Sequence, residues 1–242
     1  MISREMTSSE SASPLKFYSI LKKNGIFISY EQLQKLEAYV RLILEWNSKV
    51  NLISRSDTRD IWFAHLLHSL SPMLLFEFPL GLRVLDLGTG GGLPGIPLAI
   101  LNPECTFSLL DSTRKKIIAL QDIVSKLDLT NVTLINARAE ELSNQPVAPK
   151  FDLVVARAVA SLFELAKWSR PLLKPATRQD ARSHRTVSHP ALLAYKGGDL
   201  TREIDELKKK IPECIIEVKN VVFKDSNEIG LDEKKIVFVC FN

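Results

Sequence analysis

The chain has 242 residues, of which 45% are hydrophobic and 25% are charged, and its net charge is +4. This length exceeds what one small domain needs and is too short for two large ones, and the composition excludes collagen-like, coiled-coil and wholly disordered chains. No charge-free apolar run approaches the roughly 18 residues that a membrane helix needs, so we expect no membrane association.

The chain start and the cysteines bear on the compartment. Residues 1–14 are rich in serine and lack the apolar segment of a secretory signal, and they predict a disordered tail. Cys105, Cys214 and Cys240 lie far apart without a Cys-x-x-Cys pair, which predicts neither a disulfide framework nor a zinc site. We therefore expect a cytoplasmic protein.

The region from residue 15 to residue 81 has helical periodicity and no strand-like alternation. Apolar residues recur at helical spacing over residues 30–45, and residues 15–24 and 60–78 show similar patterns. We predict that residues 15–81 form a helical region packed on the domain that follows.

Residues 82–242 predict a domain in which strands alternate with helices. A helical pattern covers residues 113–127, and short apolar runs typical of buried strands occupy residues 83–87, 106–111, 132–135, 151–155 and 191–195. Such alternation predicts a parallel sheet covered on both faces. Two later runs, 218–223 and 236–241, have no evident helix between them and predict an antiparallel edge.

A glycine-rich loop follows the first of these strands and carries the sharpest functional signal. It reads Asp86-Leu87-Gly88-Thr89-Gly90-Gly91-Gly92-Leu93-Pro94-Gly95, and Asp111 ends the next strand. Glycines let the backbone approach a ligand closely, and an acid after the second strand can accept both hydroxyls of a ribose. The loop departs from the dinucleotide pattern G-x-G-x-x-G at Leu93, so it is more typical of an S-adenosylmethionine site. The alternative is a turn that serves strand-to-helix geometry alone.

The excess positive charge lies in one polar stretch. Residues 174–202 contain six Lys or Arg and two Asp, hence a net charge of +4, and residues 175–190 form a polar basic insertion. Arg178, Arg182, Arg185 and Lys196 are candidate contacts to RNA phosphates. A solvated surface loop, or a plain surface lysine at position 196, is the alternative.

Several blocks together resemble one family. They are Trp46–Leu52, His65–Leu70, Gly88–Leu98, Leu110–Ser112, Ala137–Glu141, Arg157–Leu162 and Lys196–Gly198. In this order they resemble the RsmG (GidB) family of small-subunit ribosomal RNA guanine-N7 methyltransferases, with Gly-Leu-Pro-Gly-Ile-Pro as the most specific segment. The chain departs from the family pattern at His68, where an aspartate is usual, and in the insertion at 175–190.

The resemblance implies a fold. It is a Rossmann-like class I S-adenosylmethionine-dependent methyltransferase, with a mostly parallel seven-stranded sheet, an antiparallel edge strand and a preceding helical N-terminal region. The implied partner is small-subunit (16S) ribosomal RNA or the assembling small subunit. We expect a monomer.

The resemblance also implies roles for individual residues. Gly88 and Leu93 line the methionine end of the cofactor, with Gly90 in the same loop, and Asp111 holds the ribose. Ala139 and Glu140 frame the adenine. Arg157 lies beside the cofactor and the incoming base, and it is the candidate catalytic residue through positioning.

The chemistry of the candidate site agrees with attack by guanine N7. That nitrogen carries a lone pair and no proton, so in-line placement can supply much of the rate. Cytosine C5 methylation needs a cysteine nucleophile, and no cysteine follows the strands of the site. Arg157 can donate to guanine O6 or to a phosphate, or it can pair with an acid such as Glu140.

Other readings stay open on the sequence alone. His65 and His68 could be two metal ligands, but the sequence shows no evident third one, so we expect no metal.

The sequence leaves other functions open. The chain can also be a methyltransferase of a protein or a small molecule, a nicotinamide-dependent oxidoreductase, or a non-catalytic cofactor-binding module of ribosome assembly.

Overall fold

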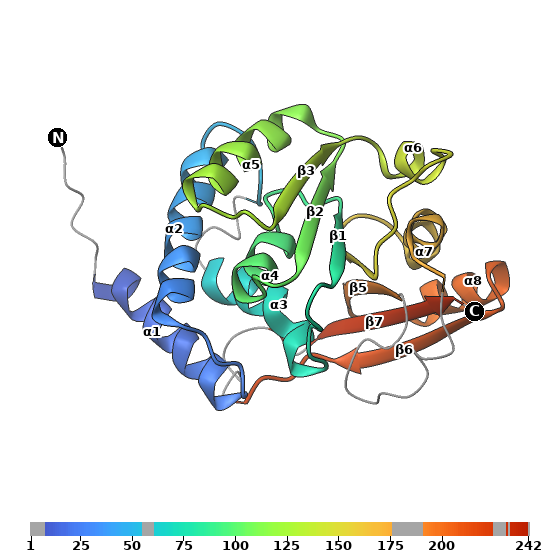
Figure 1. The fold of residues 1–242 in the computed structure, drawn as a ribbon. Helices are drawn as coiled ribbons and strands as arrows, with labels where there is room; N and C mark the ends of the chain where they lie inside the picture. The colour runs from blue at the N-terminus through green and yellow to red at the C-terminus, as the bar shows by residue number, and fades with distance from the viewer. Residues whose placement is uncertain (1–7, 55–60, 176–190, 225–230, 232, 242) are drawn as a thin grey trace.

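The structure is a computed structural model, and it describes residues 8–54, 61–175, 191–224, 231 and 233–241. The helices before residue 127 lie on one side of a twisted central sheet, and those after residue 138 lie on its other side (Figure 1). In the described part of the chain, no helix combines the length and apolar character needed to cross a membrane.

The N-terminal region is helical, as predicted. It consists of α1 (Ser8–Lys23), α2 (Tyr30–Asn47), the π-helix η2 (Ile61–Leu67), α3 (His68–Leu70) and the 3-10 helix η3 (Ser71–Leu74). Helix α2 begins at a capping box, in which Ser29 Oγ accepts from Gln32 N at 3.1 Å and Gln32 Oε1 accepts from Ser29 N at 2.9 Å.

Two details of this region differ from the prediction. Helix α1 begins at Ser8, inside the stretch 1–14 that the sequence predicted to be a tail. The single helical stretch expected over 60–78 is three short helices of different pitch, and the π-helix among them faces the sheet edge described below.

The sheet has seven strands in the order β3-β2-β1-β4-β5-β7-β6. Their bounds are β1 (Arg83–Leu87), β2 (Thr106–Asp111), β3 (Val132–Asn136), β4 (Leu153–Arg157), β5 (Ala191–Gly197), β6 (Cys214–Asn220) and β7 (Lys234–Phe241). The first five strands are parallel, and β7 is antiparallel to both β5 and β6. The predicted mixed sheet is confirmed, with the reversed strand one place in from the edge.

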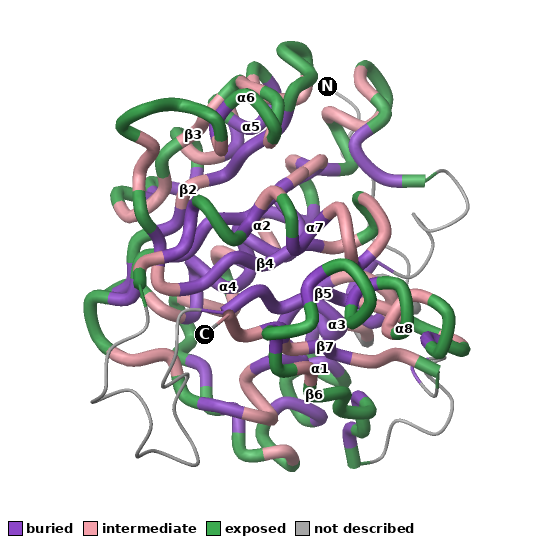
Figure 2. Tube along the Cα trace, turned by 90° about the vertical axis from the view of Figure 1, so that its right-hand side faces the viewer, coloured by how far each residue is buried: buried purple, intermediate pink, exposed green. Residues whose placement is uncertain are grey.

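The two faces of the sheet build two cores. Val84, Leu109, Val155 and Leu193 face a core formed with α1, α2, α4 (Gly95–Leu101) and α5 (Arg114–Lys126). The alternate residues, such as Leu85 and Leu110, face a second core formed with α6 (Ala139–Ser143), α7 (Leu162–Ser169) and α8 (Thr201–Lys210). The short 3-10 helix η4 (Arg170–Leu172) follows α7. Figure 2 shows the central strands as buried and α8 as largely exposed.

Parallel strands place the loops that follow them at one edge of the sheet. The loops after β1, β2, β3 and β4 therefore meet above the centre, where open α/β sheets bind their ligands.

Candidate functional site

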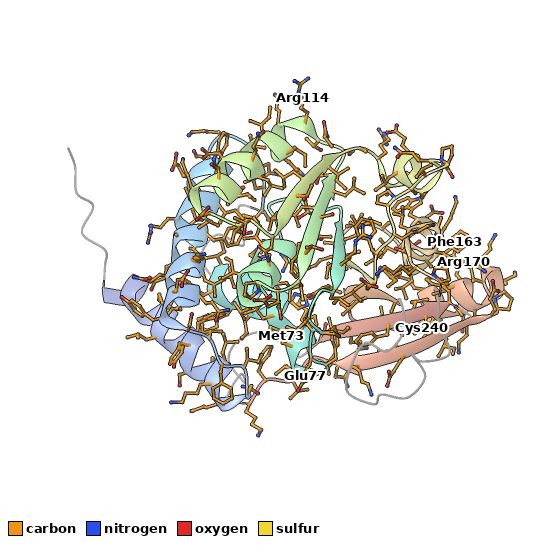
Figure 3. The ribbon with its side chains drawn as sticks, in the orientation of Figure 1. Met73, Glu77, Arg114, Phe163, Arg170 and Cys240 are labelled. Carbon is orange, nitrogen blue, oxygen red and sulfur yellow. The ribbon has the colours of Figure 1, made fainter. Side chains whose placement is uncertain are left out.

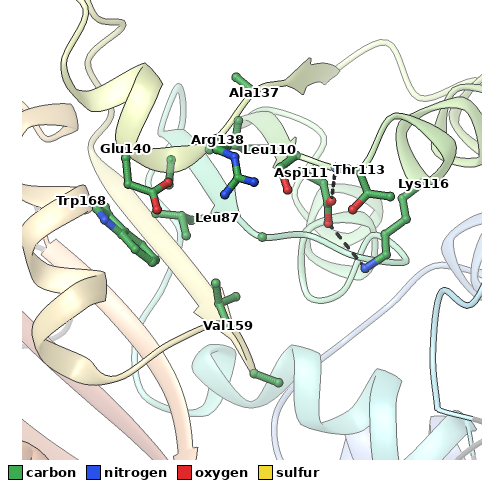
Figure 4. Close-up of a pocket in the computed structure, with 14 residues that line it drawn as sticks. Leu87, Leu110, Asp111, Thr113, Lys116, Ala137, Arg138, Glu140, Val159 and Trp168 are labelled. Carbon is green, nitrogen blue, oxygen red and sulfur yellow. Dashed lines mark hydrogen bonds and ion pairs between the residues drawn. The ribbon is translucent and has the colours of Figure 1, made fainter.

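A cavity of about 330 Å³ lies at this edge. It is lined by Leu87, Gly88, Leu110, Asp111, Ser112, Thr113, Lys116, Ala137, Arg138, Ala139, Glu140, Ala158, Val159 and Trp168 (Figure 4). Four residues expected at the cofactor from the sequence therefore come together here: Gly88, Asp111, Ala139 and Glu140.

The glycine loop forms one wall of the cavity at close range. Gly88 has a φ of 73°, a conformation that side-chain-bearing residues rarely adopt. A Cβ at this position would lie 2.6 Å from Val159 Cγ2 and 2.9 Å from Val159 Cγ1. Val159 in turn follows Ala158, which has a left-handed φ of 56°. The two backbone segments can approach this closely only because residue 88 has no side chain.

Asp111 is held at the rim by backbone donors. Its Oδ2 accepts from Gly90 N at 3.0 Å and its Oδ1 accepts from Thr113 N at 2.8 Å, while Lys116 Nζ lies 3.9 Å from Oδ2 (Figure 4). A carboxylate oxygen can accept more than one hydrogen bond, so each oxygen of Asp111 keeps a lone pair for a ligand. Asp111 thus offers two fixed acceptors, which suit a pair of neighbouring hydroxyls.

Asp86 supports the glycine loop from below. Its side chain is fully buried, and Oδ2 accepts from Thr89 Oγ1 at 2.7 Å and from Gly95 N at 2.8 Å. Burial raises the pKa of Asp86 from its ordinary 3.8 to about 6, while these two hydrogen bonds and the charge of Arg157 lower it. One carboxylate therefore ties both ends of the loop.

This pKa predicts a pH dependence of stability. Because the folded-state pKa lies above the unfolded one, the contribution of Asp86 to stability should fall as the pH rises from about 4 to about 6. Asp86→Asn does not titrate, so its free energy of unfolding relative to wild type should rise over that window, by up to about 3 kcal/mol. Urea denaturation of both proteins at pH 4, 5, 6 and 7 measures this. A difference that stays constant with pH would contradict the raised pKa.

Another part of the cavity wall is formed by Trp168, which the sequence did not predict. Trp168, on α7, lies beside Glu140 and faces the cavity with Val159 (Figure 4). Trp168 Nε1 is buried and has no hydrogen-bond partner among the described residues. No local pattern marks Trp168, since only the packing of α7 on the sheet brings it to the site.

Comparison with known proteins identifies the family. The family model GidB, described as rRNA small subunit methyltransferase G, matches residues 32–232. A Ribosomal RNA small subunit methyltransferase G of Chlorobium luteolum is 43% identical over 188 residues, covering 78% of this chain and 72% of the relative. One of Bacteroides fragilis is 37% identical over 240 residues, covering 99% of both. The chain belongs to the GidB family.

A solved structure of fibrillarin from Aeropyrum pernix with natively bound S-adenosyl-L-methionine is a more distant neighbour. It is 18% identical, with a TM-score of 0.48, and the match covers 72% of this chain and 73% of that one.

The match to the GidB family model runs from α2 to the residues just before β7, so it spans every cavity residue named above.

The side chain of Arg157 points away from the cavity. Arg157 ends β4 on the same face as Leu153 and Val155, and its guanidinium contacts the helices of the N-terminal region. Nη1 donates to the carbonyl of His65 at 3.2 Å, and Nη2 donates to His65 Nδ1 at 2.9 Å. Glu140, the acid that the sequence offered as a partner, lies on the cavity wall instead. A role for Arg157 toward the cofactor or the base stays a prediction.

These contacts predict a structural effect for Arg157. Arg157→Ala should lower the free energy of unfolding by about 2 kcal/mol, because the carbonyl and Nδ1 of His65 lose a charged, half-buried donor. Arg157→Lys keeps the charge without the forked donor geometry and should lose less. Urea denaturation checks both variants. If Arg157→Ala unfolds like wild type, the contacts to His65 contribute nothing to stability.

His68, which stands where the sequence analysis expected the family's aspartate, is buried close to Tyr195 of β5. Its ring lies 5.2 Å from that of Tyr195, and Tyr195 Oη donates to the carbonyl of Ser69 at 2.7 Å. Burial, followed by the charge of Arg157, lowers the pKa of His68 well below its ordinary value. The described residues offer no cluster of three or more potential metal ligands.

The other predicted positions are placed as follows. Leu93 is buried and outside the cavity lining, and Gly90 reaches the site through its hydrogen bond to Asp111. Lys196 is 14% exposed, and its Nζ donates to Glu203 Oε2 at 2.7 Å and to the carbonyl of Ala160 at 2.8 Å. Arg178, Arg182 and Arg185 lie outside the described residues.

Proposed function

We propose that the protein transfers a methyl group from S-adenosylmethionine to N7 of a guanine in small-subunit (16S) ribosomal RNA. One observation carries the proposal: in a chain of the GidB family, Asp111 is fixed by two backbone N–H groups at the rim of the cavity that Gly88 borders. The partner is small-subunit ribosomal RNA, free or in the assembling subunit. We place the protein in the cytoplasm, where its three free cysteines are stable as thiols.

The cavity suits the nucleoside part of this cofactor. Its volume of about 330 Å³ falls within the roughly 300–1,000 Å³ typical of small-molecule sites. Asp111 supplies acceptors for the ribose hydroxyls, and the apolar side chains of Leu110 and Val159 with the ring of Trp168 supply surface for a planar base. A side chain at position 88 would collide with Val159 at the wall of this cavity.

The chain's own residues need only bind and orient in this reaction. When bound, S-adenosylmethionine supplies a methyl group on a positively charged sulfur, which makes the methyl carbon electrophilic. Guanine N7 needs no deprotonation before attack, so the reaction requires no general base from the site. The cavity lining has no cysteine or histidine among the described residues, which favours N7 over cytosine C5 as the acceptor.

The test is transfer of a labelled methyl group. Wild-type protein is incubated with labelled S-adenosylmethionine and either a 16S ribosomal RNA transcript or intact small subunits, and the product is digested to nucleosides. We expect label in 7-methylguanosine. Label on adenine, on cytosine or on protein would overturn the proposed substrate. Calorimetry with S-adenosylhomocysteine and with NAD separates this function from an oxidoreductase, since only the former ligand should bind.

A further inference from the structure

Four basic side chains lie on two segments that border the cavity. Arg114, Lys115 and Lys116 form the first turn of α5, and Arg138 precedes α6 after β3. Arg114, Lys115 and Arg138 are exposed, and Lys116 and Arg138 line the cavity itself. Figure 3 shows Arg114 projecting from the molecule, and Figure 4 shows Arg138 and Lys116 on different sides of the opening. We call Arg114, Lys115 and Arg138 the basic rim.

The fold itself does not require these charges. The first turn of a helix is its positive end, where cations are unfavourable, yet α5 has no acid in its first turn and no side-chain cap from Thr113. Among the described residues, no acid forms an ion pair with any member of the basic rim. Lys116 differs, because its Nζ lies 3.9 Å from Asp111 Oδ2.

Several cations elsewhere on the surface have evident structural roles. Lys126 pairs with Asp122 at 2.8 Å, and Lys174 pairs with Asp152 at 2.6 Å. Lys208, Lys209 and Lys210 lie in the last turn of α8, which is the helix end that favours positive charge. The basic rim therefore combines a place beside the cavity with cations that form no ion pair among the described residues.

We propose that the basic rim binds the RNA phosphates that flank the target guanine. This inference rests on the proposed function and adds to it the surface that docks the substrate. Exposed, unpaired arginine and lysine side chains bind phosphate oxygens, and arginine can do so with two parallel hydrogen bonds. A strand that crosses the opening between α5 and Arg138 brings its bases to the cavity edge. Lys196 is already engaged by Glu203, so the basic rim takes the role that the sequence suggested for that lysine.

The test compares two triple substitutions of equal charge. Arg114→Gln/Lys115→Gln/Arg138→Gln removes the basic rim and leaves Lys116 in place beside Asp111. Lys208→Gln/Lys209→Gln/Lys210→Gln removes three cations from the far end of α8 and is the matched control. Binding of a 16S ribosomal RNA transcript is measured from 50 to 200 mM salt, with S-adenosylhomocysteine affinity and thermal unfolding measured alongside.

We expect the basic-rim variant to lose salt dependence. The slope of log K against log salt should fall by about 2 to 3, because each lost phosphate contact removes about 0.7 to 0.9. RNA affinity at low salt, measured with S-adenosylhomocysteine at saturation, should drop at least about 10-fold. The variant should unfold at or above the wild-type temperature, since cations leave the positive end of α5.

The outcomes separate this inference from the proposed function. A basic-rim variant with the wild-type salt slope, or an equal loss in the α8 control, overturns the assignment of the surface. A loss seen with intact small subunits but not with the naked transcript would assign the basic rim to a ribosomal protein and also overturn it. If the wild type binds no S-adenosylhomocysteine or methylates no RNA, the proposed function itself fails.

Discussion

Replacing Gly88 by alanine is expected to weaken S-adenosylhomocysteine binding by at least about 100-fold, which corresponds to about 2.7 kcal/mol. The added Cβ would lie 2.6 Å from Val159 Cγ2, and both residues line the cavity. Val159 must then move, and the space beside it is the cavity in which we place the nucleoside. Calorimetric titration with S-adenosylhomocysteine measures the loss, and labelled methyl transfer should fall with it.

Gly81 provides the matched control for this substitution. Its φ of 76° is close to the 73° of Gly88, but a Cβ at Gly81 meets no atom within 4 Å. Gly81→Ala therefore carries the same backbone strain, about 1–2 kcal/mol, without closing the cavity. Adding Val159→Ala to Gly88→Ala should restore part of the affinity. Equal binding by the Gly88→Ala and Gly81→Ala proteins would show that the glycine loop does not border the ligand.

The sequence predicted those parts of the fold and site that depend on local pattern. The strand runs, the glycine loop after β1 and the acid that ends β2 are each signalled by residues within a few positions of one another. Parallel pairing then brings Gly88 and Asp111 to the same edge, because β1 and β2 are in register from Arg83 to Leu87. Local pattern and one topological rule thus suffice to place the two central residues.

The parts that the sequence did not reveal depend on tertiary packing. Trp168 reaches the cavity only because α7 packs on the sheet, and the basic rim joins the first turn of α5 to the residue that precedes α6. Counting charge along the chain instead favoured residues 174–202, where the cations are contiguous. The face of the sheet on which Arg157 lies could have been predicted from the sequence. Strand alternation places Arg157 on the same face as Val155 and on the opposite face from Ala156.

Asp111→Ala is expected to lower the affinity for S-adenosylhomocysteine by about 100-fold or more, because a hydrogen bond to a charged group contributes about 1.5–3 kcal/mol and we assign two of them to the ribose. Asp111→Asn keeps one acceptor oxygen and should fall between alanine and wild type. Calorimetry measures the three affinities at one pH above 7.

Asp152→Ala is the control for loss of a partly buried acid. Asp152 Oδ2 accepts from Arg83 N at 2.9 Å and Oδ1 pairs with Lys174 at 2.6 Å, at the opposite end of the strands. It resembles Asp111 in anchoring a backbone N–H and in facing a lysine. Its removal should lower stability and leave the affinity for S-adenosylhomocysteine unchanged.

The ribose assignment itself is tested by pairing the substitution with a changed ligand. If Asp111 accepts from the 2′-hydroxyl, removing that hydroxyl from S-adenosylhomocysteine should cost the wild-type protein about half of what Asp111→Ala costs, because the hydrogen bond from the 3′-hydroxyl remains. The 2′-deoxy ligand should then cost the Asp111→Ala protein almost nothing more, because the partner is already absent. Additive losses would mean that Asp111 acts by holding Gly90 and Thr113 in place and not by contact with the sugar. The size of the coupling therefore decides between a ligand contact and a structural carboxylate.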